Sequence, residues 1–186
     1  MQLTGARLAA VAVAAFGMAG CATHGLPDDG VPSLRLAPAA LGRPLDLQQH
    51  ITLRAAGREQ QMDALLEADP ARVKLAVVAM GQVAARLEWD GVALTEWRST
   101  WWPSAVSGAR ILGDMQLSLW PLAAVQAALP AGWRASEEGG TRTLSQDGEP
   151  AVVVRHPAAD VIELDQRRAH YRLTVVSRPA SAEAAP

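Results

Sequence analysis

The sequence predicts a mainly β protein with a few helices (α+β): a curled antiparallel sheet of about nine to eleven short strands, plugged by a two-piece helix. Many short runs alternate apolar and polar residues, which is the period of a strand with one buried face. Turn signals such as Asp90-Gly91 and Asp147-Gly148 separate the runs, and such short connections favour antiparallel pairing. A sheet built from consecutive hairpins must curl to protect its edges.

Ten runs are candidates for strands. Five precede the longest helix-compatible run of the mature chain, 111–129, and five follow it. Glycine, proline and aspartate residues interrupt the alternation between them, which is typical of turns. The runs are 45–55, 62–66, 73–79, 83–89, 92–98, 133–136, 141–145, 151–155, 161–164 and 170–177.

The run 111–129 predicts a helix in two pieces. Its apolar residues follow three- and four-residue steps, as one face of a helix does. Pro121 interrupts a single helix, because its ring clashes with the preceding turn, but it fits the first turn of a second helix. Pro130 and Gly132 end the pattern. We interpret the two pieces as a plug that lies against the curved sheet.

Residues 1–20 have the features of a bacterial lipoprotein signal peptide. Arg7 makes the start positive, and the following apolar run, 8–18, is too short for a permanent transmembrane helix. Met18-Ala19-Gly20-Cys21 resembles a lipobox, in which small residues admit the peptidase and the thiol carries a diacylglyceryl group. Cys21 is the only cysteine, so it forms no intramolecular disulfide. The alternative is an ordinary signal peptide in which this cysteine stands by chance.

Lipidation at Cys21 implies a membrane anchor. Several acyl chains, such as palmitate, hold a protein on a membrane more lastingly than one chain does. Ala22 follows the cysteine where an aspartate would favour retention at the inner membrane. By resemblance to other lipoproteins, we expect the protein at the outer membrane, facing the periplasm.

Composition divides the remaining chain into three parts. Residues 21–44 are rich in proline and glycine and are expected to form a lipidated tether. Residues 45–177 are long enough for one domain, and 178–186 have the composition of a disordered tail. The net charge of −2 at pH 7 offers no basic face to nucleic acid.

Several short motifs resemble an uncharacterised proteobacterial family of outer-membrane lipoproteins that is similar in layout to LolB and its periplasmic partner LolA. Genes of that family often accompany aryl-polyene and fatty-acid-type biosynthesis clusters. The resemblance implies a half-barrel of antiparallel strands, closed by helices, around an apolar cavity for acyl chains. The motifs are 112–117, Trp120-Pro121, 127–130, Arg142 before the Asp147-Gly148 turn, and 171–175.

Seven residues are candidates for ligand binding in such a cavity. Trp101 and Trp102 are expected at its rim, because tryptophan is apolar and has one polar handle. Plain core packing is the alternative reading of each residue. The candidates for the cavity wall are Val77, Leu87, Met115, Leu119 and Val154.

Catalytic and metal-binding motifs are not found in the sequence. The four histidines lack metal-ligand spacing, and there is no Gly-x-Ser-x-Gly elbow or phosphate-binding glycine loop. Asp114 lies within an apolar run, which is costly unless the carboxylate is paired or reaches water. It could cap a turn, accept a bond from Arg98, Arg110 or Arg142, or serve as a catalytic acid. We expect no enzyme activity, no cofactor and no metal.

These observations leave three hypotheses for function. The first is an outer-membrane lipoprotein that binds or transfers an acyl-chain lipid, a polyene lipid or a lipoprotein without catalysis, together with a periplasmic carrier protein. The second is a structural or assembly lipoprotein that docks another envelope protein through a sheet edge or the loop around Trp101 and Trp102. The third is a hydrolase or acyltransferase with a site near Asp114.

Overall fold

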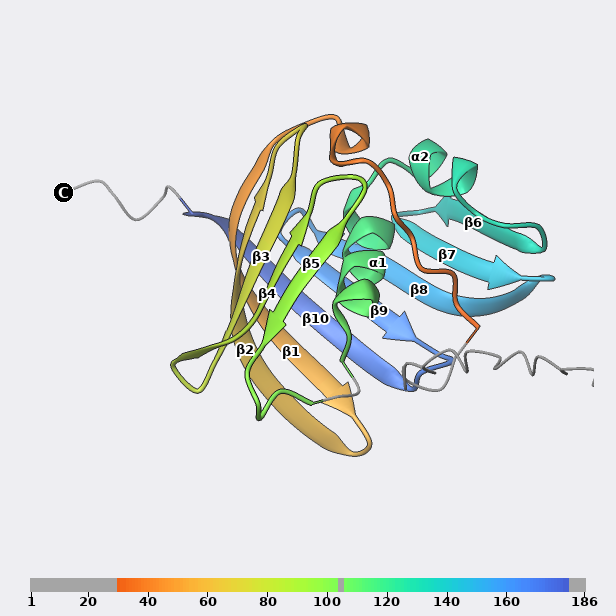
Figure 1. Cartoon of the computed structure of the whole chain (residues 1–186). Helices are drawn as coiled ribbons and strands as arrows, with labels where there is room; N and C mark the ends of the chain where they lie inside the picture. The colour runs from red at the N-terminus through yellow and green to blue at the C-terminus, as the bar shows by residue number, and fades with distance from the viewer. Residues whose placement is uncertain (1–29, 104–105, 181–186) are drawn as a thin grey trace, which may run out of the picture.

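One curled antiparallel sheet of ten strands forms the body of the protein. The structure, a computed structural model, describes residues 30–103 and 106–180, and the sheet belongs to these ranges. The strand order is β5-β4-β3-β2-β1-β10-β9-β8-β7-β6. Consecutive strands pair except β5 and β6, which form the two edges, and β10 returns to pair with β1. The sheet curls around two helices without closing (Figure 1), which confirms the predicted fold class.

The observed strands follow the predicted runs closely and extend several of them. They are β1 (Leu45–Ala55), β2 (Arg58–Ala68), β3 (Val73–Ala79), β4 (Gln82–Trp89), β5 (Leu94–Arg98), β6 (Trp133–Glu138), β7 (Thr141–Gln146), β8 (Glu149–Ala158), β9 (Val161–Gln166) and β10 (Tyr171–Pro179).

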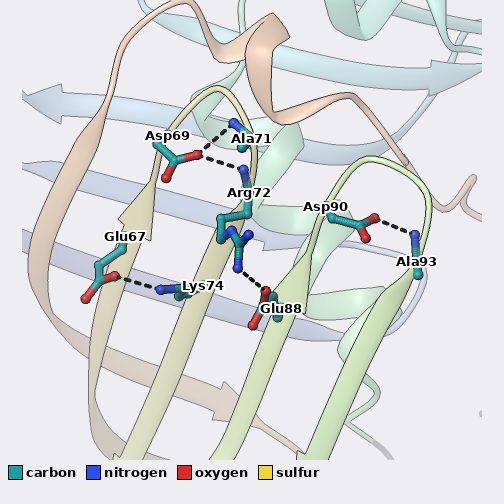
Figure 2. A network of polar contacts seen from close by, with 8 residues as sticks. All are labelled: Glu67, Asp69, Ala71, Arg72, Lys74, Glu88, Asp90 and Ala93. Atoms are coloured by element: carbon teal, nitrogen blue, oxygen red, sulfur yellow. Dashed lines mark hydrogen bonds and ion pairs between the residues drawn. The ribbon is translucent and has the colours of Figure 1, made fainter.

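The turn between β2 and β3 is built on an aspartate. The Asp69 carboxylate accepts hydrogen bonds from the backbone N–H groups of Arg72 (2.9 Å) and Ala71 (2.7 Å), as Figure 2 shows. Chiefly through the bond from Arg72, and then that from Ala71, these contacts hold the pKa of Asp69 below its ordinary value of 3.8. Ion pairs on neighbouring strands surround this turn, Arg72 with Glu88 and Lys74 with Glu67.

Asp90 forms the same kind of turn between β4 and β5. Its carboxylate accepts bonds from the backbone N–H groups of Ala93 (2.7 Å) and Val92 (2.8 Å). The bond from Ala93, followed by that from Val92, lowers the pKa of Asp90. Because the turn uses both N–H groups, β5 begins at Leu94 and not at Val92, where the sequence predicted its start.

Burial alternates along the strands and separates an inner from an outer face. On β2, Leu66 is 1% exposed while its neighbour Leu65 is 48% exposed. The inner face carries most of the hydrophobic core, to which β1, β3, β4, β7, β8 and β9 also contribute buried residues. The alternation that predicted the strands therefore also identifies the face that the helices cover.

The helical segment consists of two helices, as predicted. α1 (Gly108–Leu119) begins at Ser107, whose hydroxyl accepts a bond from the N–H of Arg110, and α2 (Leu122–Ala127) has Pro121 as its N-cap. α1 lies across the concave side of the sheet and α2 lies near β6 (Figure 1). Proline at this boundary separates the helices because it cannot continue the first one.

A buried arginine on β7 holds the C-terminal end of α1. The Nη1 of Arg142 donates to the carbonyl oxygens of Leu117 and Trp120, both at 2.7 Å. Its Nε and Nη2 donate to the Glu137 carboxylate on β6. The last carbonyls of a helix lack partners within the helix, so the guanidinium satisfies them and its charge suits that end of the helix dipole.

Residues 30–41, here called the strap, pack across the helical side of the sheet. Their buried side chains are Leu34, Leu36, Pro38 and Leu41, and the last turn is a 3-10 helix, η1 (Pro38–Leu41). The buried Gln116 side chain accepts from the Leu36 N–H (2.9 Å) and donates to the Leu36 carbonyl (3.0 Å). Two indoles add bonds to strap carbonyls, Trp89 to Leu36 and Trp120 to Ala37.

The strap corrects the predicted extent of the tether, which ran from 21 to 44. Residues 30–44 belong to the packed body because three strap leucines enter the core. At the other end β10 continues to Pro179, which pairs with Leu47, so the first two residues of the predicted tail 178–186 lie in the sheet. The predicted signal peptide, Cys21 and residues 181–186 lie outside the described residues.

Candidate functional site

The structure brings three of the predicted ligand-binding residues together in the core. Val77 on β3, Leu87 on β4 and Val154 on β8 are all buried on the sheet and belong to one hydrophobic cluster. They come from both halves of the sheet, and the curl of the sheet brings the two halves around a common interior. We call this inner apolar face, with the helix that covers it, the trough.

Met115 and Leu119 lie on α1, which covers the trough. Both side chains are half-buried and pack against the core cluster, together with Ile111 of the same helix. Methionine fills irregular apolar space and adapts to new neighbours at low cost. The covering layer on this helix therefore combines one flexible side chain, Met115, with the branched Ile111 and Leu119.

The two predicted rim tryptophans have different environments. Trp102 is half-buried against the core, and its indole N–H donates to the carbonyl of Val106 at 2.9 Å. Trp101 is 41% exposed. On the adjacent strand β5, Trp97 is 50% exposed and its ring receives the guanidinium of Arg86 at 5.6 Å. This corner of the molecule thus presents two exposed indoles.

Neither of two pockets in the described part of the chain is lined by the seven predicted residues. The smaller has a volume of about 10 Å³ and lies between the strap and α1, where Leu34, Gly113 and Leu144 line it. The larger is an open cleft of about 680 Å³ at the end of the sheet formed by the β1–β2 and β9–β10 turns. Side chains therefore occupy the trough where Val77, Leu87 and Val154 meet.

We call the larger pocket the turn cleft. Four arginines and two carboxylates line it, so its charged groups carry an excess of positive charge. Sequence reasoning missed it, although arginines flanking the Ala56-Gly57 turn were a visible signal. The lining residues are Arg54, Ala55, Ala56, Gly57, Arg58, Glu59, Asp165, Gln166, Arg167, His170, Tyr171 and Arg172.

Asp114 is buried on α1, and its carboxylate accepts a hydrogen bond from the Tyr171 hydroxyl on β10. Two of the arginines expected as its partners are engaged elsewhere: Arg98 pairs with Glu96, and Arg142 with Glu137. Tyr171 also lines the turn cleft, so this bond connects the covering helix to the cleft wall. Pairing of this kind reduces the cost of a buried carboxylate.

Residues 30–103 and 106–180 lack two features. In these ranges, no group of three or more His, Cys, Asp or Glu residues could hold a metal ion. Over the same part of the chain, no helix is long and apolar enough to cross a membrane.

Comparison with known proteins identifies a family for the chain. No curated protein matches the chain. A family described as "Protein of unknown function (DUF3261)" matches residues 46–179, which run from the second residue of β1 to the end of β10. The match covers well over half of the sequence and the whole sheet, so the chain belongs to the DUF3261 family.

Proposed function

We propose that this protein binds an acyl-chain or polyene lipid in the trough, beneath α1, and carries or transfers it in the bacterial envelope without chemical change. The supporting observation is an apolar inner face of an unclosed sheet that is covered not by a second sheet but by the strap, by α2 and, over the trough, by the single short helix α1. Removing that helix exposes a continuous apolar surface, which in water favours an alkyl chain as its replacement.

The attachment of α1 fits a cover that can move. Its apolar contacts come from the buried Leu112 and Leu117 and from half-buried residues on the same helix, while polar bonds from Gln116, Arg142 and the N-cap Ser107 fix its position. Hydrogen bonds contribute modestly to net stability because water replaces them when they break. Lifting α1 breaks buried polar bonds that together contribute a few kcal/mol, and an incoming chain offsets this cost by restoring the lost apolar contacts.

The proposed location is the outer membrane, with the body facing the periplasm and anchored by acyl chains on Cys21. The lipobox-like run that ends at Cys21 supports this location. Metabolic labelling with palmitate tests the anchor: the parent chain is expected to be labelled and sedimented with outer membranes. A Cys21→Ser chain should carry no label, and equal labelling of both chains would contradict the anchor.

Binding is tested with parinaric acid, a fluorescent polyene fatty acid. The purified full chain is expected to enhance its emission in a saturable manner. Met115→Trp enlarges a side chain under α1 and should weaken binding by tenfold or so, since overpacking an already filled space is costly. Val92→Trp introduces the same side chain on an exposed turn and serves as the matched control.

The outcome separates the trough from any other apolar surface. Weaker binding in Met115→Trp with normal binding in Val92→Trp supports the proposal. Absence of saturable binding by the parent chain, or equal affinity in both variants, contradicts it. Circular dichroism of each variant verifies that the sheet is retained.

The second candidate function is docking of another envelope protein. It is favoured by Trp97 and Trp101, which are exposed at and just after the edge strand β5. Tryptophan is enriched in the central contacts of protein interfaces, and an edge strand offers unpaired backbone groups. Cross-linking in intact cells tests this role: Trp101→Ala should abolish a specific adduct while parinaric acid binding stays unchanged.

A further inference from the structure

Two polar residues interrupt the apolar inner face of the sheet beneath α1. Gln166 on β9 is fully buried, and Tyr171, its direct partner on β10, packs against the core. On the other side of Gln166, its partner on β8 is the core residue Val152. Directly opposite residues of antiparallel strands project from the same face, so all three side chains belong to the floor of the trough. The floor therefore turns polar at Gln166 and Tyr171.

The covering helix brings polar side chains to this pair. Arg110 and Asp114 are four residues apart on α1, so they lie on the same face of the helix. The Tyr171 hydroxyl donates to the Asp114 carboxylate. The Gln166 amide, oriented to donate to the carbonyl of Ala151 (3.3 Å), accepts from Nη1 of Arg110 (3.2 Å). We call these four residues, Arg110, Asp114, Gln166 and Tyr171, the polar cluster.

In the closed structure, α1 offers the trough both parts of an acidic amphiphile. Met115 and Leu119 pack against the core as apolar groups, and the adjacent Asp114, only 8% exposed, presents a carboxylate to the floor. If an alkyl chain replaces α1, the Tyr171 hydroxyl loses the Asp114 acceptor and faces a chain that has none. Losing the acceptor of a buried hydroxyl is costly. The trough therefore favours a ligand that brings an acceptor of its own.

We propose that Tyr171 and Gln166 form a headgroup site on the floor of the trough and that this site takes the carboxyl group of a long-chain acid. The inference rests on the proposed function and narrows its lipid to a fatty or polyene acid. The ligand's carboxyl group accepts from the Tyr171 hydroxyl in the place that Asp114 occupies while α1 is closed. Its chain takes the space of Met115 and Leu119. Asp114 is thus a competitor of the ligand and not its partner.

The test compares parinaric acid with the tetraene hydrocarbon in which a methyl group replaces the carboxyl group. The readout is the ratio of the two affinities for the purified full chain, because any effect on the opening of α1 acts on both ligands and cancels. The parent chain is expected to prefer the acid. Tyr171→Phe removes only the hydroxyl and should reduce this preference about tenfold, since the acid loses a buried hydrogen bond and the hydrocarbon loses none.

The variant Asp114→Leu should give a different pattern. Leucine has a similar size but no carboxylate, so the competitor is removed and both ligands should bind about tenfold more tightly. The preference for the acid should stay as in the parent chain, because Tyr171 is intact. If the polar cluster only fastened α1, Tyr171→Phe and Asp114→Leu would both tighten binding of both ligands without changing the preference. That result would overturn the headgroup site.

The matched control removes a polar group from the same face of the sheet at another position. Gln49 on β1 is buried opposite the core residue Ala64, and its amide donates to the Ser177 hydroxyl at 3.1 Å. Gln49→Met leaves the polar cluster intact, so its preference for the acid should equal that of the parent chain. Equal loss of preference in Gln49→Met and Tyr171→Phe would show a general effect of inner-face polarity and overturn the site.

Measurements on the parent chain separate the two proposals without any variant. Equal affinity for the acid and the hydrocarbon would leave the trough as a lipid site but overturn the headgroup site. Binding of neither probe contradicts the proposed function itself. Acetate distinguishes a lipid from a free carboxylate: it should not displace parinaric acid at concentrations at which palmitate does. Equal displacement by acetate and palmitate would overturn the assignment to a lipid headgroup.

Discussion

Replacing Arg142 by methionine should loosen the covering helix without disturbing the sheet. The guanidinium is only 8% exposed and donates to the carbonyls of Leu117 and Trp120 at the end of α1. Methionine has a similar length and fills the space, but it has no donor. The substitution therefore isolates the polar attachment of α1 from the packing of β7.

The expected loss follows from the groups left without partners. Hydrogen bonds to a charged group contribute about 1.5–3 kcal/mol each, and two are lost at the carbonyls. Glu137 is 40% exposed, so water replaces its lost partner at small cost. Relief from burying a guanidinium offsets part of the loss, leaving about 2–4 kcal/mol. For a domain of this size, that lowers Tm by about 5–15 °C.

Urea unfolding followed by circular dichroism measures the free energy of unfolding of Arg142→Met and the parent chain. The control is Arg134→Met on the neighbouring strand β6, where the side chain is exposed and its loss should change stability by less than about 0.5 kcal/mol. Equal unfolding free energies for the two variants would refute the assigned role of Arg142.

Three further changes test other parts of the structure. Gln116→Leu leaves the buried Leu36 N–H without an acceptor, so stability should fall by about 1–3 kcal/mol, and hydrogen exchange at Leu36 should accelerate; unchanged exchange would contradict the strap contact. Gly108→Ala would place a Cβ 2.8 Å from Cδ of Glu96, so a lowered Tm is expected despite the better helix propensity of alanine, and a raised Tm would contradict this packing. In the Asp69→Ala chain, stability relative to the parent should be reduced at neutral pH. Because folding lowers the pKa of Asp69, the difference in unfolding free energy between the two chains should be largest above pH 3.8, where the carboxylate is ionised even in the unfolded chain. It should disappear as the pH falls through the lower pKa of the folded chain, and a difference independent of pH would contradict this role of Asp69.

Local patterns predicted the sheet because each strand has its own two-residue period. Leu75 and Val77 alternate with outward-facing neighbours on β3, and this alternation required no knowledge of the rest of the chain. Pro121 likewise identified the break between α1 and α2, since proline restricts its own backbone wherever it stands.

The strap and the turn cleft depend on residues far apart in the sequence. Leu36 and Gln116 are separated by 80 positions, and the composition of the strap resembles that of a flexible linker. The cleft exists because β10 returns to pair with β1, which places Arg172 beside Arg54. Periodicity describes the face on which a residue lies but not which strands become neighbours, so neither feature could be predicted from it.

The most direct test of the account is photo-cross-linking with a fatty acid that carries a diazirine in the middle of its chain. After irradiation of the purified full chain, peptide mapping should find the label on the trough residues Met115, Leu119 and Leu87. The outward-facing residues Leu65 and Val92 should remain unlabelled. Labels confined to the outer face, with none on α1 or its facing strands, would contradict a lipid site beneath α1.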